Sequence, residues 1–199
     1  MVSNARLERI ILEKIVSAAK KEFVKKSRLI KLKIAPVVYS AVYDSPEMSS
    51  VRNGVLKFDF GLTSDPTVQI AKAVAASCEV KVGDVRLAGN QILGGITIGI
   101  QPQDYLNVLS IPQAVNVVED GAKLPWLEWL TLKGNSIIIV DFGVSYFSGL
   151  GRTGGAIMTK GSRPFKVNSM YSGDAGNNFI TRSIEKAIPN ISKAIEQSL

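Results

Sequence analysis

Apolar residues near the start of the chain recur at spacings of three and four, with polar residues between them. The apolar positions are Leu7, Ile10, Ile11, Ile15, Ala18, Ala19 and Phe23. This is the period of a helix with one apolar face. We therefore predict an amphipathic helix from Ser3 to about Lys26, within an N-terminal helical segment over residues 1–28.

The pattern changes over residues 29–34 (LIKLKI), where apolar and basic residues alternate. Alternation predicts a half-buried strand, which Pro36 then ends or bends. Further along, Asp65 directly before Pro66 is a good start for a helix over residues 67–77.

Two predicted strands, residues 79–87 and 91–100, are separated by Ala88-Gly89-Asn90. Turn residues between two such segments predict a β-hairpin. Gly83 and Asp84 leave open a bulge or a break within its first strand.

The rest of the chain predicts short elements and one buried strand. These are a short helix from Pro102 to Leu109, a helix over 124–133 stopped by Gly134, a buried strand over 136–140 extending to about 146, and short strands over 156–159 and 165–167. Asn177 and Asn178 are expected to cap a final helix that runs to about Gln197, with a kink or an early end at Pro189.

These elements predict an α+β fold, in which a mixed or antiparallel β-sheet is packed by an N-terminal and a C-terminal helix plus short helices. The chain has 199 residues, of which 46% are apolar, enough for a sizeable core. We expect one domain over residues 1–199. No apolar stretch is long enough to span a membrane and the first residues do not resemble a signal peptide, so we expect no membrane association and synthesis in a cytoplasm.

The composition argues against an enzyme. The chain has no histidine, which removes the usual general base and a common metal ligand. The 17 acidic residues are scattered, and the single cysteine, Cys78, has no partner for a disulfide and is expected to be a small buried residue. We therefore expect no catalytic residues, no cofactor and no metal.

Positive charge is concentrated at the N-terminus. Residues 1–33 hold ten Lys or Arg and three Glu, whereas the remaining 166 residues are neutral by count, so this segment carries the whole net charge of +7. We single out a basic N-terminal patch: Lys20, Lys21, Lys25, Lys26 and Arg28. Either it meets an acidic partner, such as nucleic acid or an anionic protein surface, or it is a solvated helix face.

A second basic region lies in a glycine-rich segment, residues 147–161, which we expect to be a flexible loop. It lacks the lysine and Ser/Thr of a phosphate loop, and it does not provide the strand–GxGxxG–helix context of a dinucleotide site, so nucleotide binding is disfavoured. The candidate contact residues of this region are Arg152, Thr153, Gly154 and Arg163. They either contact DNA phosphates or an acidic neighbouring subunit, or form a solvated tip.

The two tryptophans, Trp126 and Trp129, are three residues apart and share a helix face with Leu130. Large aromatic side chains at this spacing are anchors, either in the core or at a subunit interface. The sequence leaves both readings open.

Four segments of the C-terminal half, in this order, resemble a known family: LPWLEWL (124–130), IIIVD (137–141), GRTGGAIM (151–158) and NNFITRSI (177–184). They look like neck, head–tail joining or tail-completion proteins of tailed phages, particularly contractile-tailed ones. The resemblance covers roughly residues 50–199. It implies a structural virion protein that forms a homo-oligomeric ring at the head–tail junction, assembled in the cytoplasm of a bacterial host, with no catalytic residues.

The partners implied by this resemblance are neighbouring neck, portal-adaptor or tail proteins. Non-specific contact with packaged DNA is a further option for the basic patch. A tail terminator or other tail-assembly protein is the alternative within the same class. A nucleic-acid-binding module that uses the N-terminal helix is the alternative outside it.

Overall fold

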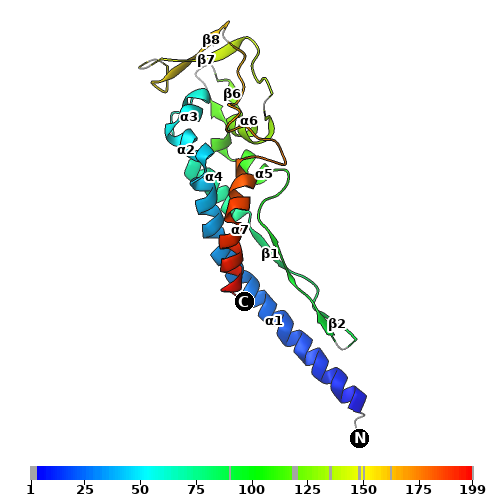
Figure 1. Ribbon diagram of the computed structural model, residues 1–199. Coiled ribbons are helices and arrows are strands. Elements are labelled where there is room, and N and C mark those ends of the chain that lie inside the picture. The colour runs from blue at the N-terminus through cyan, green and yellow to red at the C-terminus, as the bar shows by residue number, and fades with distance from the viewer. Residues whose placement is uncertain are drawn as a thin grey trace.

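The computed structural model describes residues 4–89, 91–117, 121–134, 136–147, 149, 151–161 and 163–198. The molecule is elongated (Figure 1). A long helix, α1 (Asn4–Tyr43), runs from the N-terminal tip into the body, and the hairpin formed by β7 (Phe142–Tyr146) and β8 (Ala156–Lys160) lies at the opposite end. The predicted α+β class is confirmed.

The other described elements are short, apart from the last helix. The helices are α2 (Pro46–Asn53), α3 (Val55–Asp59), α4 (Thr67–Ala76), α5 (Leu106–Leu109), η1 (Pro112–Ala114), α6 (Trp126–Leu132) and α7 (Phe179–Glu196). The strands are β1 (Glu79–Val82), β2 (Arg86–Ala88), β3 (Gln91–Leu93), β4 (Ile96–Gly99), β5 (Asn116–Val117) and β6 (Lys123–Leu124).

Within the described residues the strands form four separate antiparallel pairs instead of one sheet: β1 with β4, β2 with β3, β5 with β6, and β7 with β8. The first two pairs are the predicted hairpin, with Val80 opposite Ile98 and Leu87 opposite Ile92. Residues 83–85 separate β1 from β2, as one of the two predictions for Gly83 and Asp84 had it. Asn90, in the turn, lies outside the described residues.

The strand predicted over residues 29–34 is wrong, because α1 continues through it to Tyr43. Ile30, Ile34, Val38 and Val42 are four residues apart and all are at most 1% exposed. This spacing places them on one helical face, which packs against α4 and α7. The alternation of apolar and basic residues over 29–34 is therefore part of the longer periodic pattern of a helix. Ser3, the predicted start, lies outside the described residues.

Proline lies inside two helices, at Pro36 in α1 and Pro189 in α7. Both residues are exposed. A proline removes one helical hydrogen bond, and an exposed position lets water bind the carbonyl left free. Neither helix ends at its proline.

Three helices enclose most of the core. α1 packs against α7 and α4, and α6 closes the core through Trp126, whose ring centroid lies 5.3 Å from that of Phe60. The N-terminal cap of α7 is as predicted: the Asn178 side chain accepts from the backbone N–H groups of Ile180 and Thr181. One apolar cluster thus joins segments from both halves of the chain.

The buried strand predicted over residues 136–140 is also wrong. Ile137 is 59% and Val140 68% exposed, and Ile139 forms only an isolated bridge with Phe165. Of the strand predicted over residues 165–167, only this bridge forms. The strand pairing begins instead at Phe142, where β7 meets β8.

Candidate assembly surfaces

The N-terminal part of α1 extends past the end of α7. The Nζ of Lys33 donates to the backbone carbonyl of Gln197 at 2.8 Å, which fixes the C-terminal end of α7 beside residue 33 of α1. Residues 4–29, here called the arm, lie beyond this point and span about 40 Å at about 1.5 Å per residue. Along part of its length the arm is accompanied by the hairpin of β1 to β4 (Figure 1).

The arm carries apolar residues on two sides. Leu12, Val16, Ala19 and Phe23 are half-buried and continue the face that carries Ile30 into the core. The second side is a stripe of three residues four apart: Leu7, Ile11 and Ile15 are 52%, 49% and 46% exposed. Exposed apolar residues in a row form a continuous apolar surface, which single exposed residues do not.

The basic N-terminal patch lies on the arm. Lys20, Lys21, Lys25 and Arg28 are exposed, and Lys26 is half-buried. The sequence placed these residues in the final turns of a helix, where the helix dipole favours positive charge. Because α1 runs on to Tyr43, they lie in its middle, and the dipole effect, confined to the last turn, does not apply.

The structure places the aromatic anchors in the core and at its edge. Trp126 and Leu130 are fully buried, and the indole Nε1 of Trp126 donates to the Gln113 carbonyl at 2.9 Å. Trp129 is half-buried and packs edge-on against Phe165, with ring centroids 6.0 Å apart. Trp126 and Leu130 therefore act as core residues in this subunit.

The glycine-rich segment is only partly a loop, because residues 156–160 form β8. Ser148 and Leu150 lie outside the described residues. Arg152 is exposed, and its Nη1 and Nη2 donate long hydrogen bonds of 3.4 and 3.5 Å to the carbonyls of Val117 and Gly61. Thr153 is half-buried, and Gly154 and Arg163 are exposed.

Two glycines of this segment are required by close packing. A Cβ on Gly155 would lie 2.5 Å from the Phe58 ring, and one on Gly151 would lie 2.1 Å from the Ala156 carbonyl oxygen. Gly151 also has a φ of +75°. Gly155 therefore lets the β7–β8 hairpin approach α3, and Gly151 lets the segment before β8 pack closely on Ala156, in addition to any flexibility that the glycines provide.

Sequence reasoning missed the buried carboxyl group of Asp59. Asp59, 8% exposed at the end of α3, accepts a hydrogen bond from the Tyr146 hydroxyl. Burial raises the pKa of Asp59, and the hydrogen bond from Tyr146 partly offsets this. Burial and the bond to Asp59 raise the pKa of Tyr146. The pair links α3 to β7 across 87 residues, a separation at which no sequence pattern signals the contact.

The chain matches no known family model, no curated protein and no solved structure.

In the described part of the chain, no group of three or more acidic, cysteine or histidine side chains is placed to hold a metal ion. Among the same residues, no helix is both long and apolar enough to cross a membrane.

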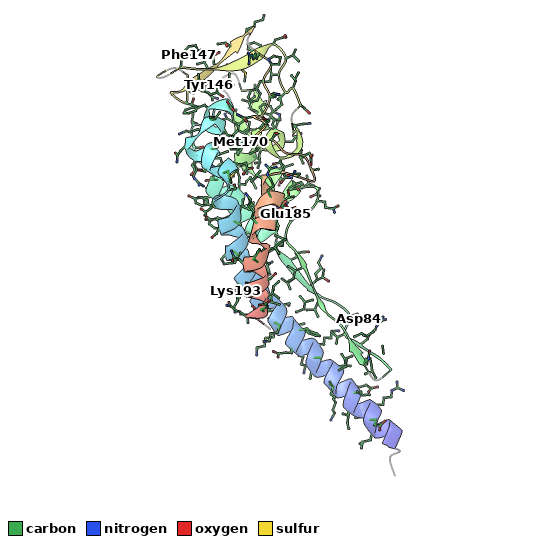
Figure 2. All side chains as sticks on the ribbon, in the orientation of Figure 1. Asp84, Tyr146, Phe147, Met170, Glu185 and Lys193 are labelled. Atoms are coloured by element: carbon green, nitrogen blue, oxygen red, sulfur yellow. The ribbon has the colours of Figure 1, made fainter. Side chains whose placement is uncertain are left out.

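The end of the molecule opposite the arm also exposes apolar side chains (Figure 2). Tyr146 and Phe147 are 54% and 51% exposed, and Met158 on β8 is 40% exposed. The two ends therefore carry different apolar surfaces: an aliphatic stripe on a basic helix, and an aromatic hairpin.

Proposed function

We propose that this protein is a structural subunit of the neck of a tailed phage, and that it forms a homo-oligomeric ring joining the head, at the portal or its adaptor, to the tail. The observation that carries the proposal is the pair of exposed apolar surfaces at opposite ends of the subunit, the stripe Leu7, Ile11 and Ile15 and the hairpin residues Tyr146 and Phe147. A closed ring uses heterologous contacts, in which two different faces of each subunit meet.

The resemblance of residues 124–184 to neck and tail-completion proteins supports the same assignment. The absence of histidine from the chain fits a structural role rather than common hydrolytic chemistry. A tail terminator or another tail-assembly protein has the same requirements for assembly and remains the nearest alternative.

The first test is the mass of the native assembly of the purified full-length protein. We expect a ring of defined subunit number, which Leu7→Glu/Ile11→Glu/Ile15→Glu reduces to monomers while leaving the circular dichroism spectrum unchanged. The matched control, Ile188→Glu, changes an apolar residue of α7 that is 53% exposed, outside both surfaces. A wild-type protein that remains monomeric at high concentration and in phage particles contradicts the proposal.

The second test addresses the basic patch. Head–tail joining, measured in particles that carry Lys20→Glu/Lys21→Glu/Lys25→Glu/Lys26→Glu, should fall and become more salt-sensitive, because the patch meets the DNA passage or an acidic neighbour. Normal joining at every salt concentration means that the charge is only solvated surface. If the isolated monomer instead binds DNA with a steep salt dependence and no ring forms, the nucleic-acid-binding module is the better assignment.

A further inference from the structure

A groove of about 660 Å³ runs between α1 and α4, away from both end surfaces. Its floor is apolar and shallow, because small residues such as Ala35, Ala75 and Ala76 line it. Leu32 stands at the groove and is 72% exposed, more than Leu7, Ile11 or Ile15 on the arm. A leucine this exposed beside an alanine floor forms an exposed apolar surface.

The charges around this groove have one sign. Arg28, Lys31 and Lys72 line it, and the described lining residues include no carboxylate. Glu79 of β1 shares a neighbouring hollow with Lys31 and is paired with Lys81 at 2.7 Å. The groove therefore favours an occupant that is apolar on the side facing the floor and acidic on both flanks.

A second copy of this chain does not provide such an occupant. The arm, which has an exposed apolar stripe, is itself basic. The exposed part of α7 carries Glu185 and Glu196 but also Lys186 and Lys193, so it has no negative excess. Nucleic acid fits the cations but not the apolar floor, because phosphates gain nothing from burying alanine and leucine surface.

We propose that this groove binds an acidic amphipathic helix of a partner protein. Apolar residues spaced at i, i+3 or i+4 and i+7 on that helix pack on the alanine floor and against Leu32. Glu or Asp residues beside them reach Arg28 and Lys31 from one side and Lys72 from the other. The groove shares Arg28 with the arm but none of the stripe residues Leu7, Ile11 and Ile15, so the proposal goes beyond ring formation and does not depend on it.

The test uses the full-length protein and a displayed library of short helical peptides, with apolar residues at those spacings and the flanking positions randomised among Glu, Lys and Ser. We expect selection to enrich glutamate at the flanks. The best peptide, labelled with fluorescein, should bind at least about tenfold more weakly to Leu32→Glu than to the wild type by fluorescence anisotropy, because a buried apolar contact is replaced by a carboxylate. Lys72→Glu should weaken binding as well.

The matched control is Leu7→Glu, another exposed leucine on the same helix, which should bind the peptide like the wild type. Circular dichroism of Leu32→Glu should be unchanged, because the side chain is mostly in water. The proposal is overturned if no peptide is enriched, if lysine-flanked peptides are selected, or if Leu32→Glu binds as well as Leu7→Glu. It is equally overturned if Leu32→Glu abolishes binding of a DNA duplex or of anionic lipid vesicles while no peptide competes.

Discussion

At the scale of single residues, the two tryptophans differ in what surrounds them. Trp126 is fully buried, with its N–H satisfied by a backbone carbonyl, whereas Trp129 is half-buried against one ring. We expect Trp126→Ala to lower the free energy of unfolding by about 3–5 kcal/mol and Trp129→Ala by clearly less. Urea denaturation of both variants measures this. Equal losses would mean that Trp129 is as enclosed in solution as Trp126.

The buried carboxyl of Asp59 predicts a dependence of stability on pH. Its pKa is higher in the folded state than the ordinary value of 3.8, so the folded protein binds the proton more tightly. The contribution of Asp59 to stability is therefore most favourable below 3.8 and is lost as the pH rises through its raised pKa.

Asp59→Asn keeps an acceptor for the Tyr146 hydroxyl and removes the charge. The stability of this variant should not fall as the pH rises through the raised pKa of Asp59. At neutral pH the variant should be as stable as the wild type or slightly more stable. Tyr146→Phe, which leaves the carboxylate without its donor, should cost about 1 kcal/mol at neutral pH. Urea denaturation from pH 4 to 8 tests both variants. A wild-type curve parallel to that of Asp59→Asn would show that Asp59 does not titrate differently on folding.

At the scale of elements, the sequence predicted the helices, hairpin and cap that adjacent residues determine. It failed where contacts with residues distant in sequence determine the secondary structure. The hairpin, α4 and the cap of α7 were all predicted from residues adjacent in sequence. Residues 29–34 fit a strand and a helix equally well, and the contacts of Ile30 and Ile34 with α4 and α7 decide for the helix. Residues 137–140 are apolar enough for a buried strand, but only Ile139 finds a backbone partner, in Phe165.

Pro36 offers a direct test of the continuous helix. Pro36→Ala restores the N–H that the carbonyl of Leu32 lacks, and an exposed helix interior favours alanine over proline by up to about 3 kcal/mol. We expect the melting temperature to rise. If the helix ended before residue 36, the substitution would not raise the melting temperature. The measurement therefore distinguishes a helix that continues through residue 36 from one that ends before it.

The packing of the β7–β8 hairpin on α3 is tested at Gly155. An added Cβ would meet the Phe58 ring at 2.5 Å, so Gly155→Ala should destabilise the protein by about 1–3 kcal/mol. The control is Gly99→Ala, where a Cβ meets nothing within 4 Å. Thermal unfolding of the two variants compares them, and similar melting temperatures would show that the hairpin moves aside without cost.

At the scale of the whole molecule, the exposed surfaces were only partly predictable. The apolar residues of the arm and its lysines were evident from the sequence, because both follow from the period of one helix. The groove between α1 and α4 was not, because it depends on how residues of the two helices that are 33 or more positions apart in sequence lie side by side. The same holds for Asp59 and Tyr146.

Exposure along α1 also predicts uneven stability. Amides of residues 4–20 are on a helix with little packing, whereas those of residues 30–42 lie against α4 and α7. In the monomer we expect the first group to exchange with deuterium by local opening, and the second only on global unfolding. Assembly should slow the first group. Equal protection of both groups in the monomer would argue against an uncovered arm.

The C-terminal end of α7 lies beside Lys33, and the arm extends beyond this point. Because about 40 Å of helix lies beyond this point, a rotation of the arm by about 10° would move its tip by about 7 Å. A small rotation of the arm at this point therefore moves its tip by more than the length of one helical turn. In the proposed ring, such a displacement would let identical subunits meet neighbours at different distances while each core stays packed as it is.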